Sequence, residues 1–201
     1  MRKRRVRKLN KSYELKPVDL STTVKRVIGF DPGSRNFGIS CVGVDADDKV
    51  IVLGNSLITN PIFSLAEGLP NALDAFLEEV GKWFTLFKPN AFVMERFQTR
   101  GGMGPLIELV SGMNLAVCSE YRHLPFKLTT AAIWKNQWHR RFDTQLDDMY
   151  RACLTTPHQL DATLIGCYGL ELGMRKQLVY GPKGIIRQTQ ATSLLKLRRP
   201  R

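Results

Sequence analysis

Apolar and polar positions alternate or recur along the middle of the chain in ways that separate strands from helices. A β-favouring run ends at Asp31, and Pro-Gly-Ser follows it before a second run in which apolar and small residues alternate. This pattern predicts a strand over residues 24–31, a tight turn and an antiparallel strand over residues 36–44. Three further runs of the same kind predict strands at residues 49–58, 90–94 and 125–128.

Apolar residues at three- and four-residue spacing predict the helices that separate these strands. One helix begins near Pro70, a residue suited to the first helical turn, and ends before Pro89. A second helix runs from Pro105 to about Arg122. Two more are predicted over residues 130–141 and from residue 157 onward, where Thr156 is a suitable N-cap and Pro157 suits the first helical position.

Carboxylates close two of the predicted strands. Asp31 ends the first strand, and Glu95 directly follows the strand at residues 90–94. A right-handed helical crossover between these strands would make them parallel neighbours, with both carboxylates at the sheet edge where α/β proteins place their sites. A bound divalent cation would neutralise charge at such buried strand ends. Asp-Pro-Gly is also ordinary turn chemistry, so Asp31 alone is equally compatible with a structural role.

An acid and an imidazole lie at the start of the last predicted helix. His158 and Asp161 are neighbours on one helical face, and Asp161 leads into the apolar stripe. Helix N-termini favour carboxylates for structural reasons too. Together with Asp31 and Glu95, however, they make a set that suits Mg²⁺ or Mn²⁺ better than zinc. Such a set would hold two ions about 4 Å apart for phosphodiester hydrolysis, with His158 as a ligand or as a group that orients the water.

Positive charge is concentrated at the two ends of the chain. The formal net charge is +12, and residues 1–26 and 174–201 are strongly basic, whereas the middle is mildly acidic. Basic ends of this kind favour DNA or RNA as partners, although a solvated tail or a targeting signal would have a similar composition. We expect a disordered arm over residues 1–23, a globular domain over residues 24–173 and a basic tail over residues 174–201.

The four cysteines are scattered, without metal-binding spacing, and indicate reduced thiols. No apolar run is long enough to span a membrane, and no signal peptide follows the basic N-terminus, so we expect a soluble intracellular protein without membrane association.

Three motifs resemble the RuvC-type Holliday-junction resolvases of the ribonuclease H-like nuclease superfamily. They are the strand I-G-F-D-P-G-S-R-N-F-G-I-S, the strand V-M-E and the helix start H-x-x-D-A. The resemblance covers residues 26–173 in order and spacing, and it implies an α/β fold with a mixed five-stranded sheet flanked by helices. It also implies that Asp31, Glu95 and Asp161 are metal ligands. His158 would take the fourth position, where many members have Asp and some have His.

The resemblance further implies a homodimer that binds a four-way DNA junction and nicks opposing strands symmetrically. Each active site would use two Mg²⁺ or Mn²⁺ ions and no small organic cofactor. Lys135 resembles a basic residue that approaches the scissile phosphate, and Phe97 lies near the family's base-stacking aromatic, one residue closer to Glu95. The glycine-rich loop after Glu95 and the helix over residues 105–122 are the expected dimer and junction surface.

Basic and aromatic residues around the predicted site are candidates for contacting nucleic acid. They are Arg35, Arg96, Phe97, Arg100, Lys135, Arg140 and Arg141. A short segment between Lys135 and His158 and the basic N-terminal extension indicate a divergent member, viral, phage or organellar. The expected location is therefore the cytoplasm of a bacterium or of a virus-infected cell, or else a mitochondrion or nucleus.

Two alternatives share the same predicted fold. One is another ribonuclease H-like nuclease that acts on flaps, other branched DNA or RNA–DNA hybrids. The other is a non-catalytic nucleic-acid-binding protein, which the presence of all four predicted ligands disfavours.

Overall fold

A computed structural model of the chain describes residues 20–21, 23–45, 50–59, 68–96, 105–142 and 156–174. The strands among them are β1 (Thr23–Asp31), β2 (Asn36–Asp45), β3 (Val50–Thr59), β4 (Ala91–Glu95) and β5 (Phe126–Thr129). The helices are α1 (Leu69–Phe87), α2 (Pro105–Glu120), α3 (Ala131–Phe142) and α5 (Pro157–Met174). Each confirms an element expected from the sequence, with bounds moved by one or two residues. The predicted arm over residues 1–23 lies almost wholly outside these ranges, and the tail over residues 174–201 lies outside them except for Met174.

The strands form one mixed sheet in the order β3-β2-β1-β4-β5. β1 pairs with β2, and β2 with β3, in antiparallel fashion, whereas β4 lies parallel to both β1 and β5. The chain crosses from β3 to β4 through α1, which makes β1 and β4 the parallel neighbours that the crossover argument predicted. The mixed five-stranded sheet is therefore confirmed.

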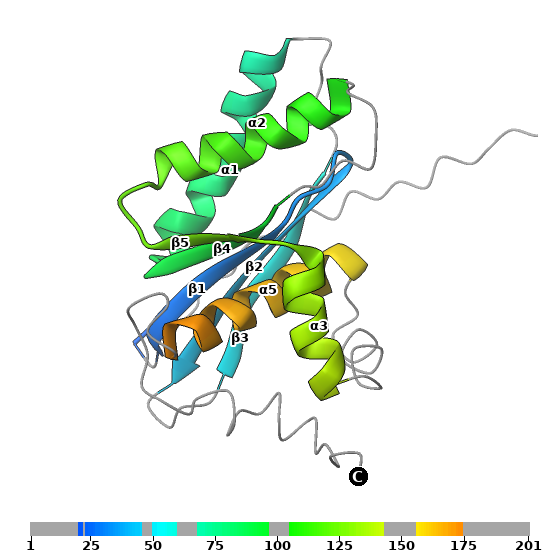
Figure 1. Ribbon diagram of the computed structural model, residues 1–201. Coiled ribbons are helices and arrows are strands. Elements are labelled where there is room, and N and C mark those ends of the chain that lie inside the picture. Colours follow the sequence, from blue (N-terminus) through cyan, green and yellow to red (C-terminus); the bar gives the residue numbers. More distant parts are fainter. Residues whose placement is uncertain are drawn as a thin grey trace, which may run out of the picture.

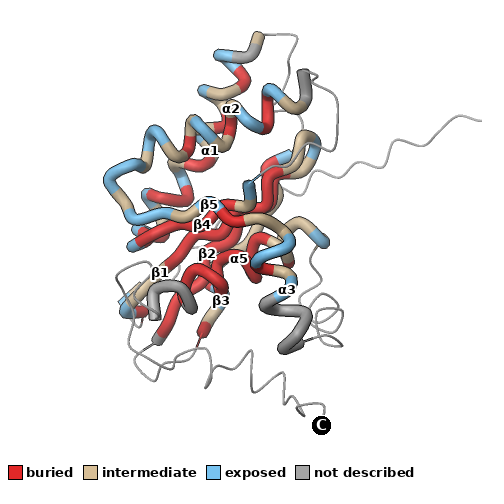
Figure 2. Tube along the Cα trace, viewed as in Figure 1, coloured by how far each residue is buried: buried red, intermediate tan, exposed pale blue. Residues whose placement is uncertain are grey.

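Helices cover both faces of the sheet. α1 and α2 lie on one face, and α5 lies on the other with α3 beside it (Figure 1). Buried residues run through the strands and along the inner sides of the helices (Figure 2). The alternation in β1 assigns its side chains to these two layers, because Ile28 and Phe30 enter the core beneath α1 and α2, while Gly29 and Asp31 belong to the α5 face.

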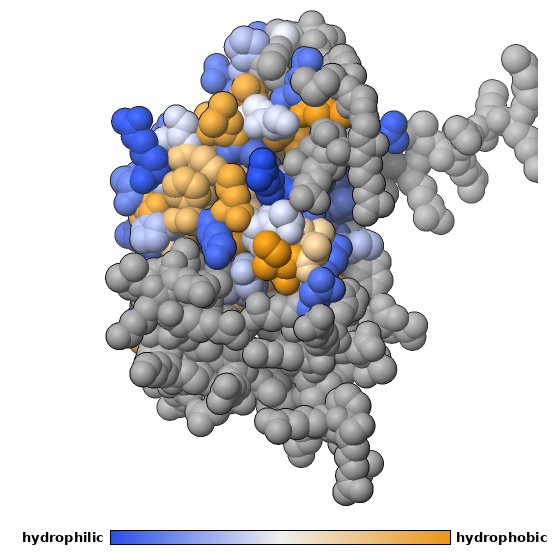
Figure 3. Space-filling model, viewed as in Figure 1, coloured by the Kyte–Doolittle hydropathy of each residue, from blue (hydrophilic) through white to orange (hydrophobic). Residues whose placement is uncertain are grey.

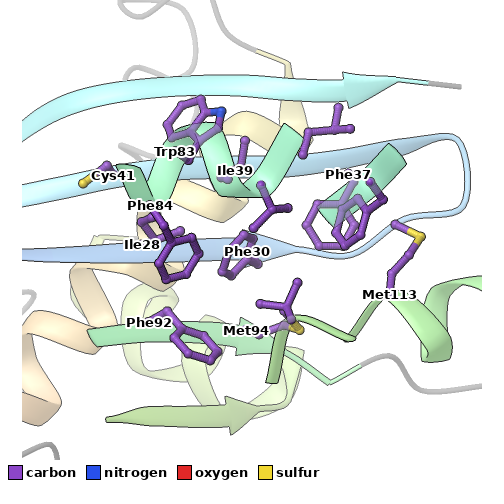
Figure 4. Packing of buried hydrophobic residues seen from close by; sticks show 14 of the residues in the cluster. Ile28, Phe30, Phe37, Ile39, Cys41, Trp83, Phe84, Phe92, Met94 and Met113 are labelled. Atoms are coloured by element: carbon purple, nitrogen blue, oxygen red, sulfur yellow. The ribbon is translucent and has the colours of Figure 1, made fainter. Parts of the chain in front are cut away.

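The core beneath α1 and α2 is rich in aromatic side chains (Figure 4). Phe30 and Phe37 meet edge to face with ring centroids 5.7 Å apart, and Phe37 meets Phe76 of α1 in the same way at 4.8 Å. Trp83 is also part of this core and packs against Phe87. These aromatic side chains hold α1 on one face of the sheet. Polar side chains such as Asp31 lie on the opposite face, which α5 covers.

α5 packs so closely on that opposite face that backbone meets backbone. A Cβ atom added to Gly29 would overlap the carbonyl oxygen of Ala162 and would lie only 2.9 Å from the Cα of Gly166. A Cβ added to Gly38 would overlap the carbonyl oxygen of His158. Glycines in β1, β2 and α5 thus bring the first turn of α5 against the ends of the strands.

The buried cysteines are free thiols, as the sequence predicted. Burial raises the pKa of Cys41 and of Cys167 to about 12, so both side chains act as small apolar groups. Cys118 is free and partly buried, and Cys153 lies outside the described residues. Across the described ranges, none of the helices combines the length and the apolar character that a bilayer-spanning helix needs.

Candidate active site

Two carboxylates lie side by side at one edge of the sheet. Phe30 of β1 is level with Met94 of β4 in the parallel pairing, so the next residues, Asp31 and Glu95, end both strands at the same edge. Their side chains alternate with the buried Phe30 and Met94 and therefore belong to the α5 face. Asp31 is only 8% exposed, and a carboxylate that is so buried needs a compensating partner.

The start of α5 is fixed by a reciprocal cap. The Gln159 amide donates to Thr156 Oγ1 at 3.3 Å, and the Thr156 amide donates to Gln159 Oε1 at 3.0 Å. This is a capping box with Pro157 at the first helical position, as the sequence predicted for Thr156 and Pro157. His158 and Asp161 therefore project from a helix start that the two reciprocal hydrogen bonds between Thr156 and Gln159 hold in place.

His158 is the partner of the buried Asp31. Its Nδ1 lies 2.7 Å from Asp31 Oδ2. This hydrogen bond raises the pKa of His158 above its ordinary value, and the nearby charges of Asp31 and Asp161 add to the effect against the opposing effect of burial. A protonated His158 would balance the negative charge of Asp31. The two side chains thus link the end of β1 to the start of α5.

Asp161 is paired with Lys135 of α3. The Lys135 ammonium donates to Asp161 Oδ2 at 2.7 Å. Burial raises the pKa of Asp161, with the hydrogen bond and charge of Lys135 acting against it. Burial alone would lower the pKa of Lys135, but its hydrogen bond to Asp161 and the negative charges of Asp161, Glu95 and Asp31 outweigh this and raise it. Lys135 is therefore a charged ammonium at neutral pH.

Glu95 has a different kind of partner, the indole of Trp134. Trp134 Nε1 donates to Glu95 Oε2 at 2.5 Å. Burial raises the pKa of Glu95; the hydrogen bond from Trp134 lowers it, and the charges of Asp31 and Asp161 raise it further. Asn114 of α2 donates to the backbone carbonyl of Glu95 at 3.4 Å.

The five predicted catalytic residues thus meet at one end of the sheet, close enough for their charges to affect one another's pKa values. As they stand in the described part of the chain, no three acidic, histidine or cysteine side chains surround a single point that could hold a metal ion. Each carboxylate is instead satisfied by a donor of the protein. The donor set still fits a hard divalent cation, because burial, together with the neighbouring negative charges, raises the pKa of Glu95 and of Asp161, and a cation would stabilise their ionised forms. The predicted metal-ligand set stays a prediction.

The candidates for nucleic-acid contact divide into two groups. Arg35 lies in the turn between β1 and β2, and Arg96 follows Glu95 directly; both are exposed near the strand ends that carry the carboxylates. Phe97 and Arg100 lie outside the described residues, as does most of the glycine-rich loop. Arg140 and Arg141 belong to α3, of which only the backbone is described at these positions.

Sequence patterns did not predict which groups hold Glu95. The structure buries Trp134 fully, and its N–H donates to Glu95. Asn114 and Thr129, which also adjoin Glu95, were not expected at all. Trp134 and Glu95 are 39 residues apart, and the only signal in the sequence was a buried-type aromatic with a polar N–H beside the predicted Lys135.

No protein-family model matches the chain, and no curated protein sequence matches it. Among solved structures, it is similar to RuvC of T. thermophilus in complex with a Holliday junction substrate, with a TM-score of 0.57 and 21% identity over 75% of this chain and 96% of that one. It is also similar to another Thermus thermophilus RuvC structure, with a TM-score of 0.57 and 19% identity over 76% and 97% of the two chains. The yeast mitochondrial Holliday junction resolvase Ydc2 matches with a TM-score of 0.50 and 19% identity over 72% and 77%. These similarities show that the chain has the fold of RuvC, and they confirm the ribonuclease H-like architecture expected from the sequence.

Proposed function

We propose that the protein is a metal-dependent nuclease that resolves four-way DNA junctions. The observation that carries the proposal is the meeting of Asp31 and Glu95, at the ends of adjacent parallel strands, with His158 and Asp161 from the capped start of α5. The similarity in fold to RuvC and Ydc2, which are described as acting on or binding Holliday junctions, supports the junction as substrate.

Asp31, Glu95 and Asp161 are the residues that would hold Mg²⁺ or Mn²⁺, with His158 as a fourth ligand. Ions bound there would activate a water molecule and stabilise the leaving oxygen of the phosphodiester. The protein supplies the rigid frame for this chemistry, because two ligands end neighbouring strands and the others lie in the first turn of a helix packed on glycine.

Charged side chains around the carboxylates would bind and orient the DNA backbone. Lys135 stays protonated and is partly exposed beside Asp161, which suits a residue that approaches the scissile phosphate. Arg35 and Arg96 are exposed at the same strand ends and can pair with flanking phosphates. The basic ends of the chain add affinity that does not depend on sequence.

A symmetric cut in two opposing strands requires two active sites, so we propose a homodimer as the active form. Large apolar side chains exposed on α2 and β5 support an interface there: Leu115, Phe126 and Leu128. Apolar surface is visible between charged groups on this face of the molecule (Figure 3). Sedimentation equilibrium of the protein alone and on a junction would test the dimer directly.

The decisive experiment compares synthetic four-way junctions with matched linear duplex, flap and RNA–DNA hybrid substrates, with and without Mg²⁺. The variants are Asp31→Asn and Glu95→Gln. Asp74→Asn is the matched control, because Asp74 is an exposed acid of α1 on the opposite face of the sheet. Paired nicks in opposing strands of the junction are expected for the wild type and the control, whereas both site variants should bind junctions without cutting them.

The other results point to the alternatives. Preferential cutting of duplex, flap or hybrid would keep the candidate site but assign the protein to another class of ribonuclease H-like nuclease. Tight junction binding without any cutting in Mg²⁺ or Mn²⁺ would contradict the proposal and favour a non-catalytic binding protein. Undiminished cutting by Asp31→Asn would show that the chemistry occurs elsewhere in the chain.

A further inference from the structure

Among the residues that the structure describes, Trp134 is the largest fully buried side chain, with 0% of its surface exposed, yet it carries a polar N–H. Buried indole N–H groups need an acceptor, because a buried donor that is left unpaired destabilises the folded protein. The acceptor here is the carboxylate of Glu95, at 2.5 Å from Trp134 Nε1. Hydrogen bonds to charged acceptors are the stronger and more directional ones, so this contact holds the Glu95 side chain in one orientation.

The chain places Trp134 against Glu95 through rigid elements on both sides. Thr129 of β5 is level with Glu95 of β4 in the parallel pairing. Only Thr130 separates β5 from α3, and its carbonyl accepts from the Trp134 amide at 3.2 Å. The indole therefore lies one helical turn from the strand that is paired with Glu95, and its position does not depend on a long connection.

The Glu95 backbone is held as well as its side chain. Asn114 Nδ2 of α2 donates to the Glu95 carbonyl at 3.4 Å, and the Arg96 amide donates to the Thr129 carbonyl at 2.5 Å. By comparison, Asp161 is held by a lysine whose side chain is 38% exposed and has many rotamers. Glu95 is thus held by a buried, rigid donor, whereas Asp161 is held by a long and partly solvated one.

We infer that Trp134 is a positioning residue for Glu95. Its N–H occupies Oε2 and leaves Oε1 as the oxygen available to a divalent cation at the ends of β1 and β4. This inference rests on the proposed function, since it assumes that Glu95 is a metal ligand. If Trp134 only filled space in the core, its replacement by another aromatic residue would not change metal affinity. As a positioning residue, Trp134 contributes to that affinity through its N–H.

The test is Trp134→Phe, which keeps a buried aromatic ring and removes the N–H donor. The matched control is Trp83→Phe, because Trp83 is also buried, at 3% exposed, but packs against Phe87 on the opposite face of the sheet. Mg²⁺ affinity is measured by calorimetry and kcat by junction cleavage over a range of Mg²⁺ concentrations. Loss of a group that orients a metal ligand typically weakens metal affinity or activity by about 10–100-fold. We expect a loss of this size for Trp134→Phe, none for Trp83→Phe, and unchanged metal-free junction binding for both.

Tryptophan fluorescence gives an independent readout in a protein that keeps the hydrogen bond between Trp134 and Glu95. In the Trp83→Phe/Trp138→Phe double variant, Trp134 is the one remaining tryptophan. Mg²⁺ should change its fluorescence saturably at the concentration that supports cleavage, because the cation draws charge from its hydrogen-bond acceptor. Adding Glu95→Gln should abolish the change.

The outcomes distinguish a failure of the role of Trp134 from a failure of the proposed function. Equal Mg²⁺ affinity and kcat in Trp134→Phe and Trp83→Phe would overturn the role of Trp134 while leaving the proposed function intact. If Trp134→Phe does not fold, the fluorescence of the Trp83→Phe/Trp138→Phe variant decides. An active double variant whose Trp134 emission does not change with Mg²⁺ would overturn the role of Trp134. A wild-type protein that neither binds Mg²⁺ nor cuts junctions would refute the proposed function itself.

Discussion

Replacing Gly29 by alanine is expected to be one of the most damaging single-methyl changes in the protein. The added Cβ would overlap the carbonyl oxygen of Ala162 and the amide nitrogen of Gly166, and would lie 2.9 Å from the Gly166 Cα. All three atoms are helix backbone, so no side chain can rotate away to make room. Relief requires α5 to move off β1, or β1 to move within the sheet.

The magnitude follows from the cost of overpacking a well-packed core, which is about 1–3 kcal/mol and occasionally more. Because the clash here is with backbone, we expect the upper end, about 3 kcal/mol of the free energy of unfolding. A slope of about 1–3 kcal/mol per M urea is typical of small proteins, so the urea midpoint should fall by about 1–3 M. Gly29 has no positive φ, so the cost is steric and does not come from backbone strain.

Urea unfolding followed by circular dichroism measures the effect, and Gly112→Ala is the matched control. A Cβ at Gly112 in α2 would meet only the Leu73 methyl groups, at 3.5 Å, which is ordinary contact. This control should be neutral or more stable by up to about 1 kcal/mol, because alanine favours a helix. Since α5 carries His158 and Asp161, Gly29→Ala should also raise the Mg²⁺ concentration needed for cleavage. An unchanged urea midpoint for Gly29→Ala would refute the backbone-to-backbone contact between α5 and the sheet.

Three further predictions concern pH, the helix cap and the basic arm. Because the pKa values of Glu95 and Asp161 are raised in the folded protein, their contribution to stability is present below their ordinary pKa values and is lost as pH rises through the raised ones. Stabilisation by Mg²⁺, measured as a shift in Tm, should therefore grow with pH over that range; a Tm shift that is constant with pH would contradict the raised pKa values. Thr156→Ala removes the capping box and should cost about 1 kcal/mol in urea unfolding, whereas Ser56→Ala, which removes a hydroxyl from the edge strand β3, should cost less. Deleting residues 1–23, which are strongly basic, should weaken junction binding and flatten its dependence on salt, and an unchanged salt slope would show that this segment does not contact phosphates.

Much of the fold follows from local pattern. The alternation around Phe37 and Ile39 predicts the strand and its faces, and Pro70 and Pro157 mark helix starts correctly because proline restricts where a helix can begin. The crossover rule was enough to put Asp31 and Glu95 at one edge of the sheet.

The contacts that hold the candidate site could not be read in the same way. Pairings such as Lys135 with Asp161, or Trp134 with Glu95, join separate elements, and no periodicity encodes which rotamers meet. The close approach of α5 depends on glycines such as Gly29 and Gly38, each of which is unremarkable in its own strand. Only the packing of a helix onto both strands reveals why a side chain is excluded there.

The hydrogen bond between Asp31 and His158 spans 127 residues of chain, and this has a consequence for biosynthesis. A nascent chain leaves the ribosome with its N-terminus first, so Asp31 and Glu95 emerge long before α5, which carries His158 and Asp161. Until α5 has been released and has docked, Val27, Val42 and Val93 lack the helix that covers them. A nascent or prematurely terminated chain therefore cannot assemble the complete cluster, and any activity that depends on the cluster can begin only after α5 has left the ribosome and docked on the sheet.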